Sequence, residues 1–163
     1  MAEAIRKAKD QILRGCGSIC DRGYVLGTAG NISVRVAGSP LFVITPTTLP
    51  YDELTEDDPV VADMNGAIVA GNRRPSMEFS MHRGILLARP DVNCIVHTHS
   101  KFATAASRTT NGNPVPIMDI ETARYIGGDI EGAAFAPPGT ETLAENVPRA
   151  LGDRAGVLMA AFH

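Results

Sequence analysis

Two histidines, His97 and His99, stand one residue apart at the end of the apolar run CIVHTH. In a β-strand, residues two apart point to the same face, so both imidazoles can converge on one ion. Zn²⁺ and similar divalent metals accept imidazole nitrogen, and three histidine ligands are typical of a catalytic zinc site. His163, after the apolar run GVLMAAF, is a candidate third ligand. The alternative is that the pair is structural, since short H-x-H motifs are common.

A carboxylate precedes the histidine pair. Glu78 lies in the first turn of a predicted helix, where the helix dipole favours the ionised form of a carboxylate. It is either a helix-start residue or, beside a metal, a general base and acid. His82 follows one turn later, and we expect it to orient a neighbour or to pack rather than to bind metal.

Three further segments carry groups that can bind an anion. The segment GTAGN contains Gly30, which lets backbone N–H groups approach an anion, and Asn31, which adds an amide donor. The segment TPTT adds the hydroxyls of Thr47 and Thr48, and Ser76 is a helix cap, a phosphate donor or both. Taken alone, each segment is better explained as an ordinary turn or loop.

The elements that must position these groups follow from apolar periodicity and turn residues. We expect an α/β layered domain over residues 1–163, with a mixed or antiparallel sheet. A capping box of Thr142 and Glu145 is expected to open the last helix. Helices are predicted at residues 4–20, 51–56, 74–90, 100–107, 120–125 and 142–151, and strands at residues 32–36, 41–45, 59–64, 67–71, 92–99, 115–118, 131–137 and 156–163.

Composition excludes several classes of function. The net charge is -3, and no cluster of Lys and Arg stands out, which argues against nucleic acid as a partner. No apolar stretch is long enough to cross a membrane. The three cysteines show no zinc-knuckle spacing and fit a reduced, cytoplasmic protein better than a disulfide framework.

Taken in order, four segments resemble the class II, zinc-dependent sugar-phosphate aldolase and adducin family. GTAGNISVR and ITPTTLPYDEL resemble its two phosphate-binding segments. RPSMEFSMHRGILLARPDVNCIVHTHS resembles its catalytic helix and first two metal ligands, and GTETLAENVPRALGDRAGVLMA resembles the helix and strand that lead to the third. The resemblance covers essentially the whole sequence and implies the layered fold of this family, with a mainly antiparallel or mixed sheet flanked by helices.

The resemblance also implies a role for each candidate residue. Zn²⁺ or another divalent metal would be bound by His97 and His99, and by His163 if a one-residue bulge precedes it. Glu78 would transfer the proton. The substrate phosphate would be bound by Gly30, Asn31, Thr47, Thr48 and Ser76. The family usually has Gly where Thr48 stands and a second Ser where Met77 stands.

The implied activity is cleavage of a ketose phosphate to dihydroxyacetone phosphate and an aldehyde through an enediolate. The same chemistry serves a 4-epimerase, a dehydratase or a decarboxylase acting on a related phosphorylated substrate, and an adducin-like interaction module would keep the fold without catalysis. The retained histidines and Glu78 favour an enzyme. The resemblance further implies a homotetramer, and a C-terminal strand and helix beyond the residues of this sequence.

Overall fold

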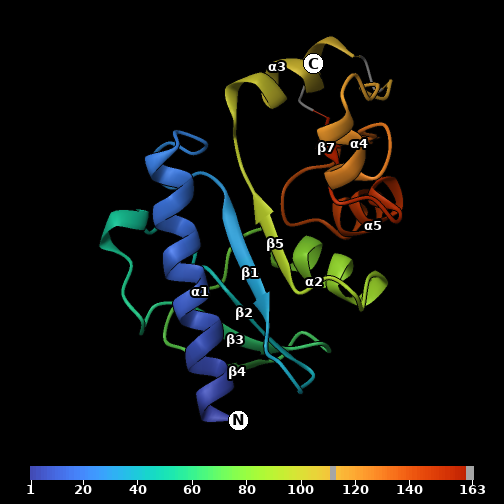
Figure 1. Ribbon diagram of the computed structural model, residues 1–163. Coiled ribbons are helices and arrows are strands. Elements are labelled where there is room, and N and C mark those ends of the chain that lie inside the picture. The colour runs from blue at the N-terminus through green and yellow to red at the C-terminus, as the bar shows by residue number, and fades with distance from the viewer. Residues whose placement is uncertain (111–112, 161–163) are drawn as a thin grey trace.

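The computed structural model describes residues 1–110 and 113–160, and Figure 1 shows the arrangement of its elements. They are α1 (Ala2–Asp21), β1 (Asn31–Arg35), β2 (Leu41–Ile44), the 3₁₀ turn η1 (Tyr51–Glu53), β3 (Val60–Asp63), β4 (Ile68–Ala70), α2 (Phe79–Ala88), β5 (Cys94–His97), α3 (Lys101–Thr109), α4 (Ile120–Ile126), β6 (Gly132–Ala133), α5 (Glu141–Leu151) and β7 (Leu158–Met159).

Five strands form one sheet in the order β4-β3-β2-β1-β5, and every neighbouring pair is antiparallel. A separate two-stranded sheet pairs β6 with β7 in parallel. Because β1 runs against both β2 and β5, its first residues lie beside the last residues of these two neighbours. The β1–β5 register places Asn31 opposite His97.

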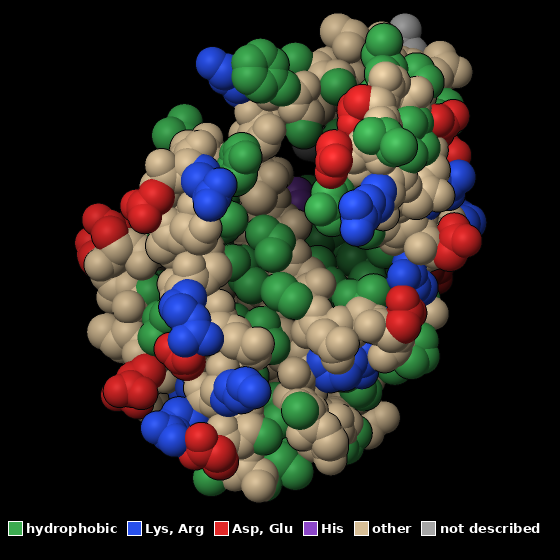
Figure 2. All heavy atoms as spheres, viewed as in Figure 1, with side chains coloured by type: hydrophobic (Ala, Val, Ile, Leu, Met, Phe, Trp, Pro, Cys, Tyr) green, Lys and Arg blue, Asp and Glu red, His purple; other side chains and the backbone are tan. Residues whose placement is uncertain are grey.

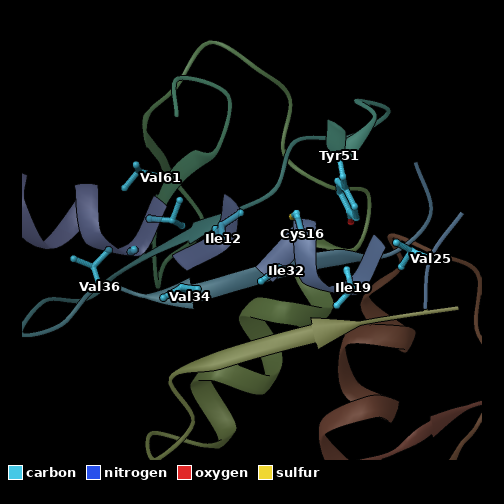
Figure 3. Packing of buried hydrophobic residues seen from close by; sticks show 11 residues of the cluster. Ile12, Cys16, Ile19, Val25, Ile32, Val34, Val36, Tyr51 and Val61 are labelled. Carbon is cyan, nitrogen blue, oxygen red and sulfur yellow. The ribbon is translucent and has the colours of Figure 1, made fainter. Parts of the chain in front are cut away.

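Helix α1 covers one face of the sheet, as Figure 1 shows. Its buried residues recur at three- and four-residue steps and pack on alternate residues of the strands. On β1 these are Ile32 and Val34, and on β2 and β3 they are Val43 and Val61. Figure 3 labels Ile32, Val34 and Val61. The apolar periodicity that predicted this helix therefore marks its core-facing side.

Helix α2 packs on the other face of the sheet. Phe42, Ile44, Val60 and Ala62 meet Leu86 of α2 there. Helix α5 packs in turn on α2 in a second apolar cluster that also includes Ala133 of β6. The predicted α/β layered fold, with an antiparallel sheet flanked by helices, is confirmed. Among the described residues, no helix is both long and apolar enough to span a membrane.

Two predicted elements differ from the structure for local reasons. The helix expected at residues 51–56 is only the 3₁₀ turn η1. The chain leaves it because Asp58 accepts hydrogen bonds from the backbone N–H and the hydroxyl of Thr55, at 2.8 and 2.6 Å, which offers the backbone a turn instead of a helix.

The strand expected at residues 115–118 was also wrong. Only one isolated bridge, between Val115 and Ile130, forms there. Pro114 and Pro116 flank Val115 and have no N–H group to donate, so they cannot continue a ladder. The strands expected at residues 131–137 and 156–163 are each two residues long within the described part of the chain.

The first turn of α5 begins earlier than predicted. Thr140, and not Thr142, occupies the N-cap, and its hydroxyl accepts the backbone N–H of Leu143 at 3.3 Å. The expected capping box of Thr142 and Glu145 is therefore wrong. Ser100 does occupy the N-cap position of α3, without a side-chain capping bond.

Helices α2 and α5 meet at a point where only glycine fits. Pro148 lies inside α5 and has no N–H, so the carbonyl of Ala144 lacks its helical donor four residues on. This carbonyl oxygen approaches α2 so closely that a Cβ atom on Gly84 would lie 2.6 Å from it. The proline and the glycine together set the distance between the two helices.

We expect Gly84→Ala to lower the free energy of unfolding by about 1–3 kcal/mol, because the two backbones must separate. Gly17→Ala is the matched control, since Gly17 lies in α1 and a Cβ atom on it would have no neighbouring atom within 4 Å. That change should raise stability by about 0.5–1 kcal/mol through helix propensity. Urea unfolding measures both, and similar effects for the two variants would contradict the close approach.

Candidate active site

The polar residues of β1 lie under α2 and not in solvent. Along this strand the apolar residues Ile32 and Val34 face α1, while the alternate residues Asn31 and Ser33 face α2. Asn31 is 6% exposed and Ser33 is fully buried. The opposite face of β1 therefore brings polar groups into the interior, where each requires a hydrogen-bond partner.

Those partners come from α2. The ring of His82, fully buried, has Nδ1 2.7 Å from the hydroxyl of Ser33 and Nε2 2.5 Å from the side-chain oxygen of Asn31. The amide nitrogen of Asn31 donates to Oε2 of Glu78 at 2.8 Å. A continuous line of hydrogen bonds thus joins the sheet to the carboxylate at the N-terminus of α2.

The predicted histidine pair lies next to this carboxylate. Nε2 of His97 is 3.0 Å from Nε2 of His99, and the two rings are almost perpendicular, with an interplanar angle of 89°. The same atom of His97 is 3.6 Å from Oε2 of Glu78. His97 and Glu78 are largely buried, whereas His99 is exposed. The structure therefore places the carboxylate of Glu78 beside a histidine pair that lies much further along the chain.

The donor set fits a divalent metal. Zinc–imidazole bonds of about 2.0–2.1 Å at tetrahedral angles hold two nitrogens about 3.3 Å apart, close to the separation of His97 and His99. Within residues 1–110 and 113–160, no group of three or more His, Cys, Asp or Glu forms a complete ligand set. His163, the predicted third ligand, lies outside the described residues.

Burial favours a neutral imidazole at His97. Desolvation lowers the pKa of His97, and the neighbouring His99 lowers it further, while the carboxylate of Glu78 opposes both effects. A metal requires the unprotonated nitrogen, so a lowered pKa keeps this nitrogen available at neutral pH.

The glycine segment touches the histidine strand directly. Gly30 has φ +78°, and a Cβ atom there would lie 2.6 Å from the carbonyl oxygen of His97 and 2.9 Å from the side chain of Val25. Both the backbone conformation and the contact require glycine. The backbone N–H of His99 also donates to the carbonyl of Tyr24 at 3.1 Å, so this loop holds both histidines in place.

The other two predicted anion-binding segments lie side by side. The N–H of Thr47 donates to the carbonyl of Arg74, and the N–H of Ser76 donates to the carbonyl of Thr45, both at 3.0 Å. The hydroxyl of Thr45 accepts the N–H of Ile32 at 3.2 Å, which joins these segments to the start of β1. The structure thus gathers Thr47 and Ser76 near Asn31, at the end of the sheet where β1 begins.

Ser76 and Thr48 have specific local roles. The hydroxyl of Ser76, which lies before the helix, accepts the N–H of Glu78 at 3.2 Å and fixes the entry into α2. Thr48 has φ +58°, a left-handed conformation that costs a threonine of the order of 1 kcal/mol more than glycine. A glycine at this position would adopt the same backbone conformation without that cost. The hydroxyl of Thr48 donates to the carbonyl of Thr47.

A cavity of about 600 Å³ opens beside the histidines, between β5, α2, α3 and α5. Glu78, His97 and His99 line one part of it, and apolar side chains such as Met81 and Leu143 line another. Figure 2 shows a hollow with apolar walls in which histidine atoms are visible. The candidate site is therefore accessible to a small molecule.

Sequence reasoning did not identify Ser33. The alternation of apolar and polar residues in NISVR is typical of a strand with one solvent-exposed face, and Ser33 lies on the polar face. The expectation that His82 orients a neighbour agrees with its contact to Asn31. The signal that could have found Ser33 is a buried histidine on the helix that covers this face, since its two ring nitrogens need partners.

The burial of His82 predicts a pH dependence of stability. Desolvation, with a smaller effect from His97, lowers the pKa of His82 from 6.5 to about 3. Between these values the unfolded chain binds more protons than the folded one. The free energy of unfolding should therefore decrease by about 1.4 kcal/mol for each unit by which the pH is lowered. The loss should begin near pH 6 and continue toward pH 3.

Urea unfolding of the metal-free protein at several pH values measures this effect. Because other groups also titrate, the wild type is compared with His82→Gln, which removes the ring. The difference in unfolding free energy between the two should shrink as the pH falls. A difference that is independent of pH would contradict a neutral, buried His82.

The comparisons with known proteins agree with this geometry. The profile described as Class II Aldolase and Adducin N-terminal domain matches residues 10–162. The chain belongs to the class II aldolase and adducin family. L-fuculose phosphate aldolase of Escherichia coli O6:H1 is 38% identical over 153 residues, which cover 94% of this chain and 69% of that protein.

Other class II aldolases show the same likeness. The 5-methylthioribulose-1-phosphate/5-deoxyribulose-1-phosphate aldolase of Rhodospirillum rubrum is 40% identical over 138 residues, covering 85% of this chain and 60% of that protein. A solved structure of L-fuculose 1-phosphate aldolase superposes with a TM-score of 0.89 at 33% identity, covering 94% of this chain and 71% of that chain. The predictions of the family, of its fold and of a class II aldolase are confirmed.

Proposed function

We propose that this class II aldolase cleaves a phosphorylated ketose to dihydroxyacetone phosphate and an aldehyde in a reaction that depends on a divalent metal. The observation that carries the proposal is the pair of facing Nε2 atoms of His97 and His99, 3.0 Å apart, with a carboxylate oxygen of Glu78 3.6 Å from the first. Relatives named as aldolases of fuculose phosphate and of deoxyribulose phosphate support the substrate class.

His97 and His99 would hold the metal, with His163 as the third ligand expected from the sequence. Zn²⁺ fits the two imidazole donors, and other divalent metals that accept imidazole fit as well. When bound, such an ion acts as a Lewis acid toward the negative charge that develops as a carbon–carbon bond breaks. The apolar wall of the neighbouring cavity limits the water around this charge.

Glu78 would transfer the proton. Cleavage removes the proton of the hydroxyl group that becomes the aldehyde carbonyl, and it leaves an enediolate of dihydroxyacetone phosphate, which needs a proton on the carbon next to the carbonyl. The carboxyl group of Glu78 lies within 3.6 Å of the imidazole of His97, so it can reach the reacting carbon of a substrate placed there. Its hydrogen bond from Asn31 fixes the orientation of the carboxylate.

The substrate phosphate would be bound at the end of the sheet where β1 begins. Asn31, Thr47 and Ser76 offer side-chain donors, and the backbone near Gly30 and Thr48 offers N–H groups. The two left-handed residues, Gly30 and Thr48, allow backbone amides to turn toward an anion. Holding the phosphate at a fixed distance from the histidines would place the scissile bond beside Glu78.

The test is direct. The zinc-loaded protein is incubated with L-fuculose 1-phosphate and with 5-deoxyribulose 1-phosphate, and the release of dihydroxyacetone phosphate is followed by a coupled reduction. We expect release from at least one substrate, its loss after chelation and its return with added zinc. A zinc-loaded protein that releases no dihydroxyacetone phosphate, or that yields only an epimer, a dehydration product or carbon dioxide from related substrates, would overturn the proposal.

A further inference from the structure

We infer that Ser33 and His82 are positioning residues for the proposed reaction, because they fix the side-chain amide of Asn31 and, through it, the carboxylate of Glu78. The inference rests on the proposed function and extends it to two residues that touch neither metal nor substrate. It is carried by the line of hydrogen bonds between the sheet and the N-terminus of α2.

Along this line of hydrogen bonds, the donor and the acceptor of each bond are determined by the carboxylate of Glu78. An ionised Glu78 accepts hydrogen bonds and cannot donate, so Asn31 must turn its nitrogen toward it. The oxygen of Asn31 then faces His82 and can only accept, so Nε2 of His82 must carry the proton. Nδ1 is left as an acceptor.

The hydroxyl of Ser33 supplies the matching donor, 2.7 Å from Nδ1. Because Ser33 and His82 are both fully buried, water cannot replace either partner. Removing the histidine would leave the Asn31 amide free to turn by half a rotation and to present its oxygen to Glu78. The pair therefore selects one of the two orientations that an asparagine side chain can take.

The orientation matters for both ends of the substrate. The amide nitrogen of Asn31 carries two protons, one of which is donated to Glu78. The other is the donor that we assign to the substrate phosphate. A turned amide would withdraw this donor and also repel the carboxylate, so one buried histidine controls phosphate binding and proton transfer together.

Three variants separate positioning from packing. His82→Leu fills the space without a donor or an acceptor, whereas His82→Gln restores an N–H donor for Asn31 and an oxygen that accepts from Ser33. We expect kcat to fall about 100-fold in His82→Leu and to stay within about 10-fold of the wild type in His82→Gln. Ser33→Ala, a small change that the fold should tolerate, is expected to lower kcat by a few-fold, roughly 3–10.

Two controls account for lost stability. Leu86→Ala removes a fully buried side chain from the same helix without touching the hydrogen bonds, so it should lower the melting temperature and leave kcat unchanged. Ser39→Ala removes a serine hydroxyl at the far end of β1, and it should also leave kcat unchanged. Equal kcat values for His82→Leu and His82→Gln would overturn the inference.

A measurement without activity tests the inference even if the proposed function fails. In the ¹⁵N spectrum of the full, unmutated chain, His82 should show a protonated Nε2 and an unprotonated Nδ1. The opposite tautomer would overturn the inference, since Asn31 would then face Glu78 with its oxygen. If the zinc-loaded wild type cleaves no ketose phosphate while this tautomer is present, the proposed function fails and the arrangement of the amide stands.

Discussion

Glu78→Gln is expected to lower kcat by about 10²–10⁴-fold, the range that a general acid or base contributes. Glutamine keeps the length of the side chain, and its oxygen can still accept the N–H of Asn31, so the local structure should persist. What is lost is a group that can take up and return a proton. Because the two histidines are unchanged, zinc should remain bound in the same amount as in the wild type.

The measurement combines steady-state kinetics with elemental analysis of zinc. Glu141→Gln is the matched control, because Glu141 also lies at the start of a helix. Removing its negative charge weakens the interaction with a helix dipole in the same way. It should leave kcat unchanged. If Glu78→Gln turns over substrate at the wild-type rate, another group transfers the proton.

The second large effect is expected from His97→Ala. Removing one of two facing imidazoles should abolish stoichiometric zinc binding and, with it, ketose-phosphate cleavage. Loss of a residue that only hydrogen-bonds to a metal ligand typically weakens metal binding by about 10–100-fold, and loss of the ligand itself should weaken it more. The change should hardly affect the sheet, because β5 pairs with β1 through its backbone.

Equilibrium dialysis against zinc, followed by elemental analysis, measures the stoichiometry. Val96→Ala serves as the control, since this neighbour on β5 has a half-exposed side chain that cannot coordinate metal. It should bind zinc as the wild type does. Retained stoichiometric zinc in His97→Ala would place the metal elsewhere in the protein.

Part of the candidate site could be predicted because its residues are polar exceptions in apolar patterns. His97 and His99 interrupt an apolar strand, and Glu78 begins a helix whose other face is apolar, so type and spacing indicated chemistry. Motif order then identified the family. The structure adds what spacing along the chain does not contain, namely that Asn31 lies opposite His97 and within hydrogen-bond distance of Glu78.

Two of the wrong predictions have a common physical origin. The short helix at residues 51–56 and the strand at residues 115–118 were predicted from the local sequence pattern, and individual neighbouring residues overrode that pattern. Asp58 accepts the N–H of Thr55 and so ends the helix at a single turn. Pro114 and Pro116 have no N–H and so prevent the strand from forming. Ser33 was missed because strand alternation distinguishes two faces but does not say whether the polar face meets solvent or a helix.

The antiparallel register between β1 and β5 determines where the chain can accept a change in length. An extra residue within Cys94–His97 would turn His97 to the other face of the sheet, away from Glu78, since side chains alternate along a strand. An extra residue in the turn at residues 36–40 would lengthen the opposite end of the β1–β2 hairpin and leave Asn31 where it is. Insertions and deletions among related sequences should therefore collect at that turn and be absent between Cys94 and His99.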